Sequence, residues 1–137
     1  MIGGDCIPKE TEYVVIMADM KHLGDQPQSI GGEGTFVGPL YEAKFELPDN
    51  VDIEEEGVLQ CRTKHNEVKN KRFFINFHIL EEVLEPHPEN KEEWMMDIAI
   101  VPKGWLTPGE NSLHIGYADE RYDDFIVDNI VLWYKTK

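Results

Sequence analysis

Residues 94–134 read WMMDIAIVPKGWLTPGENSLHIGYADERYDDFIVDNIVLWY and are the stretch that decides the fold. An apolar run, Met95–Val101, ends at a Pro-Lys-Gly corner. A Pro-Gly-Glu-Asn turn precedes a second run, Ser112–Tyr117, in which every other residue is apolar. Such alternation is typical of a strand with one buried face. After an acidic loop, the apolar run Phe125–Tyr134 closes the chain, and this order predicts an antiparallel β-sandwich.

The remainder of the chain continues the pattern of short strands and turns. Eleven glycines and eight prolines are spread along it, and no convincing amphipathic helix is present. Residues 21–34 hold four glycines and one proline, which predicts a long loop. We therefore predict an all-β, galactose-binding-like jelly roll in one domain, residues 1–137, with residues 1–10 as a loose arm. The further strands expected are Tyr13–Met17, Thr35–Leu47, Val58–Thr63 and Arg72–Leu80.

The charge balance argues against nucleic acid and anionic membranes as partners. Lysine and arginine number 13 against 27 aspartates and glutamates, a net charge of −14. Such a surface repels phosphate groups. The acidic residues gather in short loop clusters, which form either a solvated surface or a site for a hard cation.

The cysteine count and the N-terminal sequence indicate in which cellular compartment the protein is expected. Cys6 and Cys61 are too few for the disulfide framework of a small secreted domain, and we expect free thiols. The first residues, MIGGDCIPKETEY, have neither the basic region nor the apolar run of a signal peptide, and no stretch is long enough to span a membrane. The sequence as written predicts a cytoplasmic protein, or an extracellular one if the chain is a fragment of a larger secreted protein.

Residues 72–134 resemble the galactose-binding-domain-like jelly-roll superfamily. They are similar to the non-catalytic sugar-binding domain of family 2 glycoside hydrolases and to jelly-roll carbohydrate-binding modules. The family's "v-x-I-N-G" turn corresponds to a segment ending at Asn76, although Phe77 replaces the glycine. From this departure we predict that the tight turn is absent and that the strand continues through His78. The other matching residues are Phe74, Ile75, Leu106, Pro108, Gly109, Asn111, Leu113 and the final strand Phe125–Leu132.

The resemblance implies a non-catalytic binding module, with carbohydrate as the expected ligand. The alternative is a structural domain that oligomerises or binds another protein through the same sandwich. Sugars are held by aromatic faces and a few planar polar groups. Two loops, Leu80–Trp94 and Tyr117–Tyr122, offer such groups. The alternative for Trp94 is a place in the hydrophobic core. The candidate ligand-binding residues are Trp94, Tyr117, Asp119, Arg121 and Tyr122.

A structural calcium ion is a further expectation from the resemblance. Modules of this fold often hold calcium between an early acidic residue and an aspartate of the last strand. The matching positions are Glu10 or Glu12 and Asp128, with Glu12 and Asp128 preferred. In the alternative, Asp128 and Asn129 anchor a turn or bulge before Ile130.

Catalytic patterns are weak. The two serines, Ser29 and Ser112, lie outside any G-x-S-x-G motif, and the five histidines are too scattered for a transition-metal site. Acidic pairs suited to glycoside hydrolysis cannot be recognised without a cleft. We therefore expect no enzymatic activity.

Overall fold

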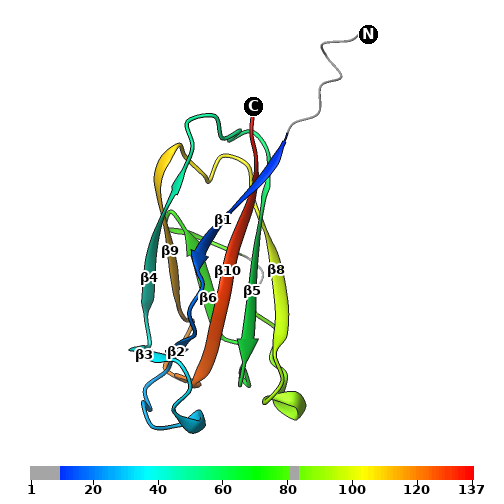
Figure 1. Cartoon of the computed structure of the whole chain (residues 1–137). Helices are drawn as coiled ribbons and strands as arrows, with labels where there is room; N and C mark the ends of the chain where they lie inside the picture. The colour runs from blue at the N-terminus through cyan, green and yellow to red at the C-terminus, as the bar shows by residue number, and fades with distance from the viewer. Residues whose placement is uncertain (1–9, 81–83) are drawn as a thin grey trace.

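The computed structural model describes residues 10–80 and 84–137, which form two β-sheets packed face to face (Figure 1). The predicted arm, apart from Glu10, and Cys6 lie outside the described residues. The Glu10 carbonyl accepts a hydrogen bond from the Thr136 amide at 2.9 Å. No helix in the described ranges is long and apolar enough to cross a membrane.

The larger sheet, sheet A, has six strands in the order β3-β2-β10-β5-β8, with β1 also paired to β10. All pairs are antiparallel except β2 with β3. The long strand β10 lies at its centre (Figure 1). The strands are β1 (Thr11–Met17), β2 (Lys21–Leu23), β3 (Thr35–Gly38), β5 (Gly57–Lys64), β8 (Met95–Val101) and β10 (Phe125–Lys135).

The smaller sheet, sheet B, has four antiparallel strands in the order β4-β9-β6-β7. They are β4 (Tyr41–Leu47), β6 (Lys71–Ile75), β7 (His78–Ile79) and β9 (Gly109–Tyr117). The only helical turns in the described part of the chain are two 3₁₀ turns, Ile30–Gly32 and Pro88–Asn90.

The core lies between the sheets and follows the alternation of the sequence. On β5, Leu59 and Cys61 are buried while Gln60 between them is half-buried and faces outward. On β9, Leu113 and Ile115 are completely buried. The period of two places these residues on the inner faces, where apolar burial stabilises the sandwich by about 25 cal/mol per Å².

The outer faces of the two sheets differ in character. Sheet B exposes the alternating charges Glu42, Lys44 and Glu46, and Glu42 lies 2.7 Å from His114. Sheet A exposes six large apolar side chains on one face, here called the apolar face; they come from three strands, β1, β10 and β8, and β5 lies between the last two. They are Tyr13, Val15, Met96, Ile98, Ile100 and Trp133.

Two predicted segments are divided differently in the structure. The expected strand Thr35–Leu47 is two strands in different sheets, because the chain turns at Gly38, which has φ 82°, and at Pro39. The predicted loop 21–34 begins with the short strand β2, which was not predicted because the segment is rich in glycine. Strand β2 pairs with β10, and its residues His22 and Leu23 are buried.

The prediction that Phe77 abolishes the tight turn is wrong. Asn76 and Phe77 form a two-residue turn between β6 and β7, both with positive φ (49° and 68°). Positive φ at both central residues defines the type I′ hairpin that Asn-Gly normally makes. The Asn76 side chain secures the turn by donating to the Trp105 carbonyl at 2.7 Å and accepting from the Ser112 amide at 2.9 Å. Phe77 is therefore held in a strained conformation, with 75% of its surface exposed.

A buried ion pair anchors the loops at the lower end of the sandwich in Figure 1. Lys71 on β6 is fully buried, and its ammonium donates to Asp123 Oδ2 at 2.7 Å. The same oxygen accepts from the backbone amides of Glu67 and Val68 at 2.8 and 3.2 Å. Burial lowers the pKa of Lys71, and the Asp123 carboxylate opposes that shift.

Replacing Phe77 is expected to release the strain of the turn. Phe77→Gly should be more stable than Phe77→Ala by about 1 kcal/mol, because only glycine accepts positive φ without a Cβ clash. Urea denaturation of the two variants measures the difference, and the alanine variant controls for loss of the ring. Equal stability of the two variants would show that the turn carries no strain.

Removing the Asp123 charge is expected to destabilise the fold. Asp123→Asn leaves the Lys71 ammonium buried without its counter-charge, which costs about 3 kcal/mol in comparable buried pairs. The double variant Lys71→Met/Asp123→Asn should recover part of the loss, because it removes the uncompensated charge. Thermal and urea unfolding measure the loss of stability, with the exposed Glu120→Gln as control. A loss of stability no larger than that of the control would contradict the role of Lys71 and Asp123 as a stabilising buried pair.

Candidate binding site around Trp94

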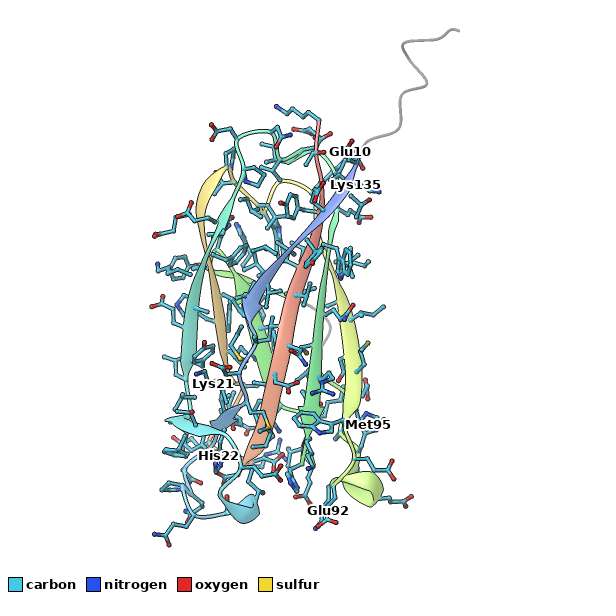
Figure 2. The ribbon with its side chains drawn as sticks, viewed as in Figure 1. Glu10, Lys21, His22, Glu92, Met95 and Lys135 are labelled. Carbon is cyan, nitrogen blue, oxygen red and sulfur yellow. The ribbon has the colours of Figure 1, made fainter. Side chains whose placement is uncertain are left out.

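Three loops meet at the lower end of the sandwich. The loop 65–70 lies between the other two: the His65 amide donates to the Lys91 carbonyl at 2.6 Å, and the Glu67 amide donates to Asp123. Figure 2 places Glu92 and Met95 at this end, which is also the end of His22, and Glu10 and Lys135 at the opposite end. The two loops predicted to hold ligand therefore lie at one end of the molecule.

Trp94 is half-buried immediately before β8 and packs against cations of β5. The Arg62 guanidinium carbon lies 4.4 Å from the centre of the Trp94 ring, and Lys64 Nζ lies 5.5 Å from it. Both cations occupy outward positions of β5, two residues apart, as the period of a strand requires. The alternative that placed Trp94 in the core does not hold, because its ring packs on the cations of the outer face.

Arg62 is held in place by a carboxylate of β10. Its Nε donates to Asp128 Oδ1 at 2.9 Å and its Nη2 donates to Oδ2 at 2.8 Å. This hydrogen-bonded pair raises the pKa of Arg62. The ladder between β10 and β5 shifts register between Asp128 and Val131, and Asn129 has φ 48°. The predicted bulge before Ile130 is thus present, and it aims Asp128 at Arg62.

Glu33 joins the site from the long loop between β2 and β3. Its carboxylate accepts from Lys64 Nζ at 3.2 Å and lies 3.5 Å from His65 Nε2. The hydrogen bond from Lys64 lowers the pKa of Glu33 below its ordinary value of 4.5. Glu33 is consequently ionised at neutral pH, and it stands beside Lys64, one of the two cations that lie over the Trp94 ring.

The tyrosines of the predicted loop 117–122 are used within the protein. The Tyr117 hydroxyl donates to the Asp123 carbonyl at 2.6 Å, and burial raises the pKa of Tyr117. Tyr122 packs edge-on against Tyr117 with 5.3 Å between ring centres. Neither ring therefore forms a free, flat platform.

The charged residues of that loop pair with each other. Asp119 Oδ2 accepts from Arg121 Nη2 at 2.7 Å, and its Oδ1 accepts from the Asn70 side chain at 2.8 Å. The bond from Arg121, with that from Asn70, lowers the pKa of Asp119. Of the five predicted ligand-binding residues, Trp94 lies in the cluster with Arg62, while the four of loop 117–122 form a separate group.

The structure does not bring the two preferred calcium ligands together. Glu12 pairs with Tyr134, roughly 20 Å along β10 from Asp128 at about 3.3 Å per residue. Glu10 lies beyond Glu12, at the far end of the molecule (Figure 2). Asp128 already binds Arg62 through both oxygens. Within residues 10–80 and 84–137, no group of three or more histidine, cysteine or acidic side chains is arranged to hold a metal ion.

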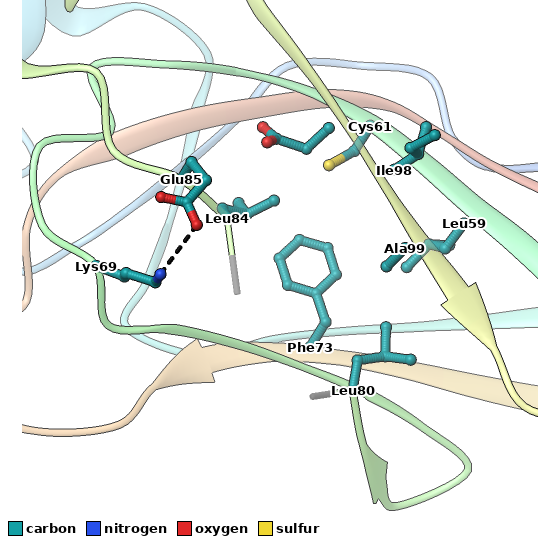
Figure 3. A pocket seen from close by; sticks show the side chains of 10 residues that line it. Leu59, Cys61, Lys69, Phe73, Leu80, Leu84, Glu85, Ile98 and Ala99 are labelled. Carbon is teal, nitrogen blue, oxygen red and sulfur yellow. Dashed lines mark hydrogen bonds and ion pairs between the residues drawn. The ribbon is translucent and has the colours of Figure 1, made fainter. Parts of the chain in front are cut away.

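A cavity of about 390 Å³ lies between the two sheets beside β8 (Figure 3). Its walls are mostly apolar, and burial raises the pKa values of two groups that line it, the Cys61 thiol and the Asp97 carboxyl. The Lys69–Glu85 ion pair, 2.9 Å long, lies at its rim. Leu80 and Leu84 line it from either side of the undescribed segment 81–83. The main apolar lining residues are Leu59, Phe73, Leu80, Leu84 and Ala99.

The Trp94 site thus combines one aromatic ring with fixed planar groups. The alternation of β5 places Arg62 on an outer face, so that position could be inferred from the sequence. Nothing in the sequence joins Glu33 to this site, because its loop is placed by tertiary contacts. Such a set can stack an apolar ring face and hydrogen-bond hydroxyl groups at its edge.

Comparison with known proteins supports the fold. The sequence matches no protein-family model and no curated protein. Among solved structures, dimeric latent PorU from Porphyromonas gingivalis superposes with a TM-score of 0.63 at 12% identity, over 96% of this chain and 13% of that chain. An exo-beta-1,3-galactanase from Phanerochaete chrysosporium superposes with a TM-score of 0.50 at 14% identity, over 89% of this chain and 28% of that chain.

A third match is the CBM36-1 domain of a multidomain xylanase from the hindgut metagenome of Trinervitermes trinervoides, with a TM-score of 0.47 at 10% identity, over 91% of this chain and 96% of that domain. This chain spans less than a third of each of the first two proteins. Likeness at these identities concerns the fold. The chain is an antiparallel β-sandwich with a jelly-roll fold, as residues 72–134 predicted, and it shares this fold with the matched parts of PorU and the galactanase.

Proposed function

We propose that this chain is a non-catalytic binding domain that takes carbohydrate at the Trp94 site. The observation that carries the proposal is the half-buried Trp94 ring with the Arg62 guanidinium over it, beside hydrogen-bonding groups that are already fixed. The C–H face of a sugar ring packs on an indole, and its hydroxyls pair with guanidinium and carboxylate groups.

Pre-organisation favours binding at this place. Arg62 keeps 36% of its side chain exposed although Asp128 holds it at two points. Its remaining donors therefore need little ordering when a ligand arrives, which reduces the entropic cost of association. Glu33, held by Lys64, supplies further acceptors beside that lysine.

The carboxylates of the site are suited to binding rather than to glycoside hydrolysis. A hydrolase needs one carboxylic acid with a raised pKa to protonate the leaving group. Here the pKa of Glu33 is lowered by Lys64, and Asp128 is occupied by Arg62. Glu33 is therefore not poised as a general acid at neutral pH, and both Asp128 oxygens are engaged in hydrogen bonds.

Carbohydrate as the ligand class has one further support. The exo-beta-1,3-galactanase that shares this fold was solved with beta-1,3-galactotriose. That sugar belongs to the galactanase, and for this chain galactans are the first ligands to test.

Affinity electrophoresis in gels containing galactan, xylan or glucan is the direct experiment. We expect retardation of the native chain in at least one gel. Trp94→Ala should weaken binding about 30-fold, because removing a central aromatic anchor typically costs about 2 kcal/mol. Trp133→Ala, a tryptophan on the same sheet face, is the matched control and should bind as the native chain does.

Two outcomes would contradict the proposal. If no carbohydrate retards the native chain, carbohydrate is excluded as the ligand class. If Trp94→Ala and Trp133→Ala lose affinity equally, the ligand lies elsewhere on the sheet.

The second candidate function is an interaction domain that oligomerises through its sandwich. The apolar face favours it, because six exposed apolar side chains on one face of sheet A exceed what scattered surface residues provide.

A further inference from the structure

We propose that β8 pairs antiparallel with β8 of a second copy of this chain, with Ile98 at the centre of the pairing. The inference concerns a different part of the molecule from the Trp94 ligand site and does not depend on carbohydrate binding. It rests on the free edge of sheet A, the side chains along that edge and the charges at its two ends.

Strand β8 is an open edge. It pairs with β5 on one side, from Met95↔Thr63 to Val101↔Gly57, and no other strand within residues 10–80 and 84–137 pairs with it. Figure 1 shows β8 at the side of the sandwich, with no strand beyond it. The outward backbone groups of an edge strand are free to form a ladder with another strand.

The edge has few of the features that usually prevent such pairing, and the inward-facing Asp97 is the one charged residue within the strand. The outward side chains of β8 are Met96, Ile98 and Ile100, exposed to 61%, 62% and 47%. The strand contains neither lysine nor proline, and its ladder with β5 shows no register shift. An exposed, apolar edge strand of this length is a template for strand addition.

The sequence of β8 is complementary to itself. In a two-fold antiparallel pair centred on Ile98, Ile98 faces its own copy and Met96 faces Ile100. On the inner face Asp97 lies opposite Ala99, so no two like charges meet. Apolar cross-strand pairs stabilise an antiparallel ladder, and a two-fold axis makes each such contact twice.

The same register joins opposite charges just beyond both ends of the strand. Glu93 and Lys103 are equally distant from Ile98, so each glutamate lies opposite the lysine of the other copy. Both residues are exposed in the single chain. This charge complementarity identifies a second copy, rather than an unrelated strand, as the occupant.

The edge strand of sheet B shows the opposite design. Pairing β4 with itself about Lys44 would set lysine against lysine and Glu42 against Glu46. Like charges directly opposite each other destabilise a strand pair. Self-association is therefore expected at β8 and not at β4.

The size of the contact predicts reversible association. One seven-residue ladder with its flanking side chains buries less than about 1,200 Å² in total, the range of weak and transient complexes. The net charge of −14 on each copy opposes association, and salt near 0.15 M screens this repulsion over about 8 Å. We expect a dimer in equilibrium with monomer.

Charge exchange tests both the partner and the register. Sedimentation velocity from about 1 μM to about 1 mM covers the range expected for a contact of this size. The native chain should shift from monomer to dimer. Glu93→Lys and Lys103→Glu should each self-associate about tenfold more weakly, because like charges then meet at both ends. An equimolar mixture of the two variants should regain the native association.

Two further variants complete the design. Ile98→Lys places a charge opposite its own copy at the centre and should remain monomeric, alone or in mixtures. Lys44→Glu, at the matching outward position of β4, should associate as the native chain does. Thermal unfolding of each variant checks that it is folded. A native chain that stays monomeric at the highest concentration, or a mixture no stronger than its components, would overturn the proposal.

Discussion

Sheet A depends on the pairing capacity of a single strand, β10. Along one edge it pairs with β2 through its first residues and with β1 through its last, and along the other edge it pairs with β5. Its inward residues, among them Ile130 and Leu132, are completely buried. A strand with partners on both edges and a core on one face leaves only its outer face for other roles. The bulge at Asn129 uses that face to bring Asp128 to Arg62, and through Arg62 it positions Trp94.

The contrast between the two sheets gives the molecule a polar and an apolar side. Sheet B presents an alternation of Glu42, Lys44 and Glu46 to solvent, which keeps its edge from pairing. Sheet A presents apolar side chains from Tyr13 on β1 across to Ile100 on β8. The lower end of the same face carries Trp94 and its charged neighbours. Both proposals, ligand binding at Trp94 and self-pairing at β8, therefore concern one side of the sandwich.

The fold could be predicted largely from local patterns. The alternation in Ser112–Tyr117 and the turn at Pro108 and Gly109 reflect backbone requirements that act within a few residues. The turn at Asn76 and Phe77 could not be predicted in this way. Its positive φ angles are enforced by hydrogen bonds from Asn76 to residues distant in sequence, which overrode the preference of Phe77.

The site was less predictable than the fold. An aromatic residue in the loop before a predicted strand marked Trp94, but its partners come from β5 and from the loop that holds Glu33. The tyrosines of the loop 117–122 have the composition of a sugar site, yet they pack on each other because Asp123 is drawn inward by Lys71. Composition identifies candidate groups, whereas tertiary contacts decide which of them remain free.

The central claim is that the molecule meets its partners through sheet A and keeps sheet B in solvent. Hydrogen exchange at the backbone amides of the two long edge strands, β8 and β4, tests it most directly. Amides of Met95–Val101 should exchange more slowly as the protein concentration rises and recover their fast exchange on dilution, while those of Tyr41–Leu47 stay unchanged. Identical exchange of β8 at every concentration, or protection that appears instead at β4, would contradict the account.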